Sequence, residues 1–592
     1  MNLARLFWAR ILVSILYYAV SADANKAVDI FVNKVGPFRN PHETYLYYSL
    51  PLCRPETIKF RSMSVGQALD GNKLAYSDFR IKFLDVVVYI RIMFIAENVE
   101  SRVLCVLNLT AKEVEFLRRA IDEQYYFEFF VQDRPVGGYL GETMETSLLP
   151  HTHEQYLFKH IVFTFYHNNK EILSACLKME DPVSLKSAEN MKGVSYSYSA
   201  RWNYTELSPD EMAVKVNKLS KNMDRIHWIS IINSVALNIL LVIFISAILA
   251  KMLGRELSSG VEGAEEGDVK DSEATWKRIS ADVFRYPKFK RIFCAVVGAG
   301  SQFLVLISGL VVMGIMRLFD VANHGAATST GCVLFAFTCI IAGYVSGALY
   351  KMMDGDKWVS LVNVTAALFV GPFFVVWAVD NCVAWSYGST QALPVSILIS
   401  LVALWMFVGY PLTVIGSLLG KNLTSTFEPP CRTKNVPREI PPSPIYSAWP
   451  GHIIFGGCIP CSAIAVELYY IFGAVWGREE YTLYGLLLIM MMMLIFITAS
   501  VSICLTYSLL VAEDYRWWWR SVFSVGASAG FMFIYAVLYV IKRTEISGLL
   551  QISQFLSWTL STCYAFFLAV GSVSFFASFV FVRFIYRSVK LD

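Results

Sequence analysis

Residues 229–249 read ISIINSVALNILLVIFISAIL, a run of 21 residues without a charged side chain. A helix of about 20 apolar residues is long enough to cross the roughly 30 Å hydrocarbon core of a bilayer. Backbone polar groups find no water in that core, so a run of this kind adopts a helix, which satisfies them internally. The stretch therefore predicts a transmembrane helix.

Eight more apolar blocks follow toward the C-terminus. With the first they give nine predicted spans, at about 229–249, 292–316, 330–350, 358–379, 392–419, 451–475, 482–510, 521–541 and 553–582. The composition agrees, because 55% of the residues are hydrophobic and only 17% are charged, which is too apolar for a soluble protein of this size. Residues 226–592 are thus predicted to form a nine-helix transmembrane domain.

The chain before residue 226 has a more polar composition. Residues 1–24 read as a secretory signal peptide, because Arg5 and Arg10 precede a short apolar run, which small residues follow. An uncleaved membrane anchor is the alternative. Either one places the domain formed by residues 25–225 in the lumen.

Residues 25–225 alternate polar and apolar side chains, which is typical of strands with one buried face. Strands are expected at 79–84, continuing through the β-branched run 86–95, at 125–131 and at 160–166. One helix is expected at 111–121, with Thr110 as its N-cap and Glu113 at its third position. Several short strands favour an all-β sandwich. The predicted fold class is therefore an α-helical polytopic membrane protein with nine transmembrane helices, preceded by a luminal all-β, sandwich-like domain.

The distribution of Lys and Arg predicts the orientation of the spans. The five segments on the side of the C-terminus contain 20 of these residues, against 4 in the four loops on the opposite side. Cytosolic loops are enriched in Lys and Arg. The C-terminus is thus expected in the cytosol and the N-terminal domain in the lumen, which agrees with an odd number of spans.

The predicted luminal domain contains candidate sites for covalent modification. An oxidising lumen permits one disulfide among Cys53, Cys105 and Cys176, and the sequence leaves the pairing open. Asn108 and Asn203 each begin an Asn-x-Thr sequon and are candidate N-glycosylation sites.

Glu467 falls well inside the predicted span 451–475. Ionisable groups at membrane depth are costly and commonly functional. Glu467 is interpreted either as a polar site for a proton, a cation or a partner helix, or as a carboxylic acid satisfied by a neighbouring helix. Asp380, at the end of a predicted span, is expected to be solvated. Gly526 and Gly530 form a G-x-x-x-G pair that is expected to pack helices within the chain.

The sequence gives no reason to expect an enzyme. It contains no H-E-x-x-H metalloprotease motif and no Walker phosphate loop, and it predicts neither a cofactor nor a metal site. The net charge is +4, and the basic residues are scattered, so no nucleic-acid partner is expected. The expected partners are the lipid bilayer and other membrane proteins.

Eight stretches, in order along nearly the whole chain, resemble the nonaspanin (transmembrane nine) family. They are 35–45 (VGPFRNPHETY), 50–53 (LPLC), 226–233 (IHWISIIN), 282–285 (DVFR), 343–346 (GYVS), 437–441 (PREIP), 467–471 (ELYYI) and 512–521 (AEDYRWWWRS). The last stretch is the most distinctive, and the count of nine spans agrees with the resemblance.

The resemblance implies a location and a role. The family ends in Lys-x-Asp or a close variant, a pattern that Lys590, Leu591 and Asp592 fit, and this tail implies binding to the COPI coat and retention in the Golgi. Nonaspanins are linked to the sorting of membrane proteins, including those with glycine-rich spans. The resemblance therefore implies a multi-pass protein of Golgi and endosomal membranes that sorts membrane-protein cargo. The competing hypothesis is a secondary transporter or channel that uses Glu467 and helices broken by glycine and proline.

Overall fold

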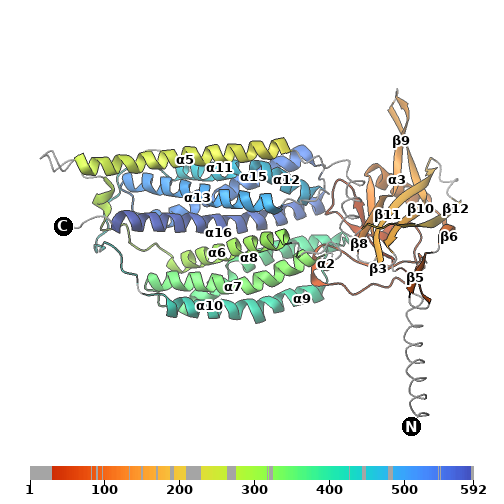
Figure 1. The fold of residues 1–592 in the computed structure, drawn as a ribbon, viewed down its shortest axis with the longest axis horizontal. Coiled ribbons are helices and arrows are strands. Elements are labelled where there is room, and N and C mark those ends of the chain that lie inside the picture. The colour runs from red at the N-terminus through yellow and green to blue at the C-terminus, as the bar shows by residue number, and fades with distance from the viewer. Residues whose placement is uncertain are drawn as a thin grey trace, which may run out of the picture. The chain divides into compact units, whose positions relative to one another are not determined.

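The computed structural model describes most of the chain. The described residues are 28, 30–79, 81, 83–88, 91–96, 98–131, 134–148, 151–168, 171–186, 192–207, 228–262, 275–316, 318, 325–425, 427–431, 433–442, 448–477, 484–544, 546 and 548–587. They form two compact units, one with the strands and one with the long helices (Figure 1). The strand unit also includes the later segment Ser386–Ala392. The predicted signal peptide, residues 1–24, lies outside the described residues.

The strand unit contains two larger sheets in its described part. The first has the order β2 (Tyr45–Leu46), β1 (Ile30–Pro37), β7 (Tyr125–Val131) and β8 (Arg134–Tyr139), with β3 (Ala75–Tyr76) also paired to β1. The second has the order β11 (Glu171–Ser184), β10 (His151–Asn168), β12 (Lys192–Tyr204) and β6 (Val99–Asn108), with β9 (Gly141–Leu148) paired to β10. Strands β10 and β12 are parallel, whereas the other pairs are antiparallel.

The two larger sheets share one aromatic core. Phe129 of β7 and Phe163 of β10 are both fully buried. The ring of Phe79 lies between them, with centroid distances of 5.8 Å to Phe129 and 5.2 Å to Phe163. Two sheets that bury their inner faces against each other form a sandwich, so the expectation of a sandwich-like β domain is confirmed.

Two local expectations have different outcomes. Helix α3 (Ala111–Asp122) begins with a capping box, in which Glu113 N donates to Thr110 Oγ1 and Thr110 N donates to Glu113 Oε2, as predicted. The β-branched run 86–95 lies in strands, as expected, but the chain reverses within it, so that its residues belong to two antiparallel strands, β4 (Phe83–Val88) and β5 (Arg91–Ala96). A run of β-branched residues favours strands equally on both sides of a reversal, so composition did not reveal the turn. The shorter helices of this unit are α2 (Val65–Leu69) and a 3₁₀ turn at Tyr47–Ser49.

The second unit is almost entirely helical. Its long helices are α5 (Trp228–Glu262), α6 (Lys290–Ile315), α7 (Ala326–Met352), α8 (Trp358–Ser386), α9 (Val395–Leu404), α10 (Tyr410–Leu423), α11 (Trp449–Ala463), α12 (Ala465–Trp476), α13 (Tyr484–Val511), α14 (Trp517–Gly526), α15 (Ser528–Arg543) and α16 (Leu549–Arg587). A short 3₁₀ turn, Thr275–Ile279, precedes α6. Helix α16 is the centre of the unit and contacts α6, α13, α14 and α15 (Figure 1).

The described helices provide eight spans that are long and apolar enough to cross a membrane, and nine when the bent pair α11–α12 counts as one. Two spans are composite. Helices α14 and α15 form one, and α9 and α10 form another, joined by a π-helical turn at Trp405–Gly409 in which Tyr410 N donates to Trp405 O. The fold class is thus confirmed as an N-terminal β domain followed by a polytopic helical unit. The side of the membrane on which each end lies stays a prediction.

Helices α7 and α10 approach closely through glycines on both sides. A Cβ added to Gly347 of α7 would lie 2.6 Å from the carbonyl oxygen of Ser417 in α10. A Cβ on Gly343 would clash with Thr413 O, and Cβ atoms on Gly416 and Gly420 would clash with carbonyls of α7. Each helix therefore contributes a G-x-x-x-G pair that allows backbone-to-backbone contact.

Candidate functional site

Glu467 lies where the span α11–α12 breaks. The two helices meet at Ile464 with a bend of 66°, and Glu467 is in the first turn of α12. Only 3% of its surface is exposed. Ser234 Oγ of α5 donates a hydrogen bond to Glu467 Oε2 over 3.1 Å. The predicted intramembrane carboxyl group is therefore buried inside the helical unit and contacts a second helix.

A proline stands near the end of α11, before the break. Pro460 lies inside α11 and removes one backbone donor from the turn that precedes it, while the helix itself continues to Ala463. The preceding glycines hold α11 against α14 and α15, because a Cβ on Gly456 would lie 2.5 Å from Ser524 O and one on Gly457 would lie 2.6 Å from the ring of Phe531. The chain restarts at α12, whose N-terminal end favours a negative group in its first turn.

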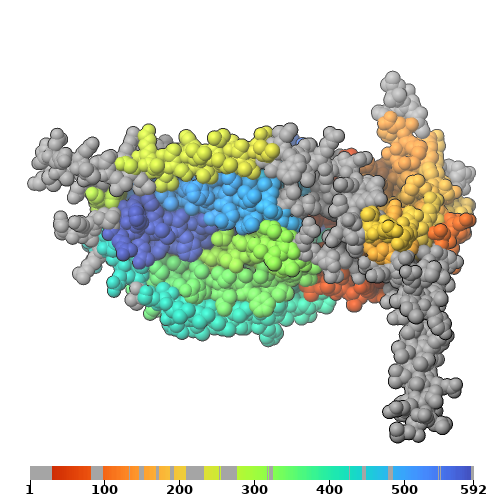
Figure 2. All heavy atoms as spheres, in the orientation of Figure 1, coloured from red at the N-terminus to blue at the C-terminus, as the bar shows by residue number. Residues whose placement is uncertain are grey.

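Helix α5 presents a polar stripe to the rest of the unit. Ser234 and Asn238 are four residues apart and are both buried, so they lie on one face. Asn238 Nδ2 is 3.9 Å from Met490 Sδ, and Asn238 Oδ1 has no hydrogen-bond partner within the described residues. The outward face is apolar, with Leu240 and Phe244 each 63% exposed. Figure 2 shows α5, in yellow, along the surface of the helical unit. We call Ser234, Asn238 and Glu467 the α5 seam.

Three of the stretches that resemble the nonaspanins contact one another through residues in the loops between helices. They are 282–285, 437–441 and 512–521. Asp514 is buried and accepts bonds from Arg516 Nε (3.0 Å) and Arg516 Nη2 (3.1 Å). Arg520 Nη2 lies 3.4 Å from Asp514 Oδ2. Burial opposes ionisation of Asp514, but the hydrogen bonds from Arg516 and the charge of Arg520 hold its pKa below the ordinary value. Within the stretch 512–521, the Asp514 carboxylate thus lies between the guanidinium groups of Arg516 and Arg520.

The stretches 282–285 and 437–441 contact the stretch 512–521, and each other, through ion pairs and hydrogen bonds to the backbone. Arg438 Nη2 contacts Glu513 Oε2 at 2.6 Å, and Arg438 N donates to Asp282 Oδ2. Asp282 also pairs with Arg285 at 2.6 Å. The first tryptophan of the distinctive stretch, Trp517, donates from Nε1 to Val283 O over 2.9 Å. These residues tie loops that are far apart in sequence, which is a structural role.

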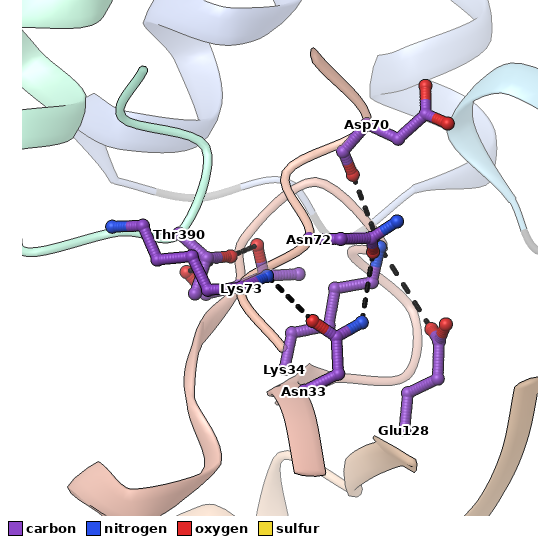
Figure 3. A network of polar contacts seen from close by, with 8 residues as sticks. Asn33, Lys34, Asp70, Asn72, Lys73, Glu128 and Thr390 are labelled. Atoms are coloured by element: carbon purple, nitrogen blue, oxygen red, sulfur yellow. Dashed lines mark hydrogen bonds and ion pairs between the residues drawn. The ribbon is translucent and has the colours of Figure 1, made fainter. Parts of the chain in front are cut away.

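A polar network in the strand unit holds the segment Ser386–Ala392 (Figure 3). Thr44 Oγ1 and Thr390 Oγ1 are 2.6 Å apart, Thr390 N donates to Thr44 O, and Ser389 Oγ donates to the same carbonyl. Thr44 and Thr390 are nearly fully buried. Segments more than 340 residues apart therefore belong to one folded unit.

The same view shows a second group of contacts, made by Asn33 and Lys34 of β1. Asn33 Nδ2 donates to Asn72 Oδ1 (2.9 Å), and Lys73 N donates to Asn33 Oδ1 (2.8 Å). Lys34 Nζ lies 3.3 Å from Asp70 O and 4.0 Å from Glu128 Oε2. Hydrogen bonds of this kind satisfy buried polar groups, so the network is structural.

The candidate modification sites lie at different places in the strand unit. Cys53 and Cys105 form a disulfide, and Cys176 is a free, partly buried thiol. The side chains of Asn108, at the end of β6, and Asn203, in β12, are exposed. Both are accessible to a glycan, and their glycosylation stays a prediction. The tail residues Lys590, Leu591 and Asp592 lie outside the described residues.

One expectation about a membrane-depth group is wrong. Asp380 is 7% exposed, because α8 continues to Ser386 and Ser553 Oγ of α16 donates to Asp380 Oδ1 over 3.1 Å. The predicted pair Gly526 and Gly530 is only half used, since a Cβ on Gly526 would meet the Phe567 ring whereas one on Gly530 would meet nothing within 4 Å.

Sequence reasoning missed the glycine contact between α7 and α10. Its signal was present as two G-x-x-x-G spacings, at 343–347 and 416–420, although the spacing alone does not say which helices meet. The string 526–530 also matches the letters of a G-x-S-x-G elbow. That elbow needs a strand-to-helix turn with an exposed serine, whereas Ser528 is fully buried and is the first residue of α15, just after the end of α14. Within the described residues, no group of three or more His, Cys, Asp or Glu side chains is arranged to hold a metal ion.

The comparisons with known proteins agree along the whole chain. A family model described as endomembrane protein 70 matches residues 44–549. The chain is 44% identical to mouse transmembrane 9 superfamily member 1 over 95% of its own length and 93% of the relative. It is 37% identical to Arabidopsis thaliana transmembrane 9 superfamily member 3 over 96% and 94%, and 36% identical to the Dictyostelium discoideum protein "Putative phagocytic receptor 1b" over 96% and 95%. No solved structure matches the chain. The protein therefore belongs to the endomembrane protein 70 family, the family of the transmembrane 9 superfamily members.

Proposed function

We propose that this protein sorts other membrane proteins in Golgi and endosomal membranes, and that it contacts their transmembrane helices at the α5 seam. The N-terminal β domain lies in the lumen and the C-terminal tail in the cytosol. No catalytic step is part of this role. The name of the Dictyostelium relative, a phagocytic receptor, supports a role in membrane traffic.

The observation that carries the proposal is the α5 seam. Glu467 is buried and accepts a hydrogen bond from the Ser234 side chain. Asn238 Oδ1, one turn further along α5, has no partner within the described residues. Polar groups in a membrane gain from hydrogen bonds across helices. Because all three seam residues are buried, a client span reaches them only when α5 separates from the rest of the unit. A small residue on the contact face of the client then lets its backbone come close to these groups. This favours glycine-rich spans as cargo.

The test compares clients of the intact protein with clients of a Glu467→Leu variant, by proximity labelling and pull-down from native membranes. We expect single-span membrane proteins to be enriched with the intact protein and lost with the variant. Asp380→Asn is the matched control, because Asp380 is similarly buried and also accepts one bond from a serine. Size-exclusion chromatography checks that the Glu467→Leu variant is folded. If the folded variant captures the same client proteins as the intact protein, the seam is not the contact.

The tail Lys590-Leu591-Asp592 is proposed to bind the COPI coat. The sequence of this tail offers a cation, on Lys590, and two nearby carboxylates, the Asp592 side chain and its terminal carboxylate, which together make a compact recognition element. A tag fused after Asp592 masks the terminal carboxylate and should move the protein out of the Golgi. A tag inserted before the tail leaves it free and is the control. An unchanged distribution of the masked protein contradicts this part of the proposal.

A second candidate function is a secondary transporter, which the break at α11–α12 favours. Discontinuous helices expose unpaired backbone groups at membrane depth, and transporters use them to hold ions and substrates. Glu467 lies three residues from the break. Solute flux in liposomes that contain only this protein, abolished by Glu467→Gln, supports this function. If the protein carries no solute across the liposome membrane but still captures client proteins, the transporter is excluded and sorting remains the proposed role.

A further inference from the structure

A pocket of about 560 Å³ lies at the start of α8, and this volume is within the range of small-molecule sites. Its lining comes from Asp356 and Lys357, the two residues before α8, and from the first two turns of the helix, which include Ser360 and Asn363. Val359, in the same lining, is 75% exposed. The pocket is therefore open to the surroundings of the helical unit.

The ends of three candidate membrane spans meet at this pocket. Arg291, the second residue of α6, donates from Nη1 to Ser360 Oγ over 2.6 Å. Lys421, in the last turn of α10, places Nζ 4.8 Å from the centre of the Trp358 ring at the start of α8. Helices α6, α8 and α10 all belong to the candidate spans. The ends of apolar spans lie at the edge of the hydrocarbon core, where the head groups of lipids begin, so the pocket lies at head-group level.

Three cations surround the pocket without a carboxylate partner. Within the described residues, Lys357, Arg291 and Lys421 form no ion pair. Arg291 contacts a hydroxyl group and Lys421 contacts an aromatic ring, and neither contact supplies a negative charge. One carboxylate, on the exposed side chain of Asp356, also lines the pocket. The site thus presents three positive charges and one negative charge.

A polar side chain lies deeper in the span. Asn363 is five residues beyond the start of α8, about 7.5 Å along the helix axis, and its side chain is exposed. Tyr410 OH of α10 donates to Asn363 Oδ1 over 2.9 Å, whereas the amide NH₂ group of Asn363 has no acceptor within the described residues. Lipid tails offer no acceptor to an exposed amide. The ester carbonyls of a glycerolipid, which lie just below its phosphate, do.

We propose that this pocket binds the head group of phosphatidylserine from the surrounding bilayer. This head group contains a phosphate, a carboxylate and an ammonium, so its two negative charges and one positive charge match the three cations and the one carboxylate of the site. Lys357, Arg291 and Lys421 hold the phosphate and the carboxylate, and Asp356 holds the ammonium. The Asn363 amide donates to an ester carbonyl. The loops at this end of the spans are predicted to be cytosolic, and the cytosolic leaflet is the one that contains phosphatidylserine.

The test measures the binding of short-chain phosphatidylserine to the purified full-length protein in detergent, by native mass spectrometry. Phosphatidylglycerol has the phosphate without the amino acid, phosphatidylcholine has no net charge, and glycerophosphoserine is the head group without acyl chains. We expect saturable binding that is tightest for phosphatidylserine, weaker for phosphatidylglycerol and weakest for phosphatidylcholine. Glycerophosphoserine should bind far more weakly than the lipid, because it gains nothing from the apolar surface of the spans.

Three variants locate the binding. Lys357→Gln removes one charge from an exposed side chain, so it should still fold. One basic residue near a membrane surface changes affinity about fivefold, so the Kd for phosphatidylserine should rise about fivefold. Lys542→Gln is the matched control, because Lys542 is an exposed lysine in the last turn of α15 and does not line the pocket. Asp356→Asn should weaken phosphatidylserine binding and leave phosphatidylglycerol binding unchanged or tighter.

Four results overturn the proposal. If phosphatidylserine binds no more tightly than phosphatidylcholine, the pocket is not a site for anionic lipid. An equal loss in Lys357→Gln and Lys542→Gln means that overall charge, and not this pocket, attracts the lipid. Glycerophosphoserine that binds as tightly as the lipid identifies a site for soluble phosphates. If Asp356→Asn keeps the full preference for phosphatidylserine over phosphatidylglycerol, the amino-acid head group is not what the pocket recognises.

Discussion

The substitution Gly347→Ala tests the close contact between α7 and α10. The added Cβ would lie 2.6 Å from Ser417 O and 3.0 Å from Ser417 Cα. The shorter approach is about 0.8 Å inside the 3.4 Å at which ordinary contact begins. The neighbouring atoms belong to the backbone of a helix and cannot rotate away, so α7 and α10 must move apart.

The cost follows from this displacement. A gap of 0.5–1 Å removes a quarter to a half of the dispersion attraction of each facing atom pair, and overpacking a tight interface costs about 1–3 kcal/mol. Alanine has a better helix propensity than glycine by about 1 kcal/mol, which offsets part of this loss. We therefore expect a net destabilisation of up to roughly 2 kcal/mol.

The assay is equilibrium unfolding in mixed micelles with a rising fraction of SDS, followed by tryptophan fluorescence. Gly331→Ala is the control on the same helix, because a Cβ there meets nothing within 4 Å, and it should be neutral or slightly stabilising. Adding Gly416→Ala to Gly347→Ala should cost less than the sum of the single changes, since the first already separates the helices. Equal stability of Gly347→Ala and Gly331→Ala would refute the reasoning.

Three further predictions concern single contacts. Asp514→Asn should destabilise the protein by roughly 3 kcal/mol, because it leaves two arginines without their carboxylate. The pKa of Asp514 is lowered in the folded state, so its stabilising effect is present above the unfolded pKa near 3.9 and disappears as the pH falls through the lower folded value. The midpoint temperature of thermal unfolding should therefore fall more steeply with decreasing pH for the wild-type protein than for Asp514→Asn. Cys53→Ser should cost about 2–4 kcal/mol in the thermal unfolding of the full chain, whereas Cys176→Ser, which breaks no disulfide, should leave the midpoint nearly unchanged. Thr390→Val should cost about 1 kcal/mol and raise hydrogen exchange at 386–392, and unchanged exchange would contradict a role for its bond to Thr44.

The sequence predicted the helical unit well because the hydrocarbon core imposes a strong requirement on length and apolarity. Helix ends were less predictable. The predicted span ended at residue 379, whereas α8 continues to Ser386, and this extension buries Asp380. Whether a carboxylate near a span end is solvated depends on which helix faces it, here through Ser553 of α16, and no local pattern contains that information.

The candidate site was only partly predictable. Burial of Glu467 followed from its position in an apolar run. Its partner Ser234 lies 233 residues away in sequence, and no spacing rule connects the two. In the same way, the cysteine count allowed a disulfide but left its pairing open, because pairing depends on how the fold brings Cys53, in a loop, next to Cys105 of β6. Long-range pairing is a property of tertiary packing rather than of composition or periodicity.

The π-helical turn at Trp405–Gly409 determines the direction in which the side chains of α10, the helix that follows it in the same span, point around the helix axis. A π turn holds one more residue than an α turn, and one residue of an α-helix corresponds to a rotation of about 100°. Removing any one residue from this turn would leave the span long enough for the bilayer and nearly unchanged in apolarity. It would also swing Gly416 and Gly420 about a quarter of the way around the helix axis, away from α7. The span therefore tolerates changes of side chain far better than changes of length, and a single-codon deletion there is equivalent to losing the helix contact itself.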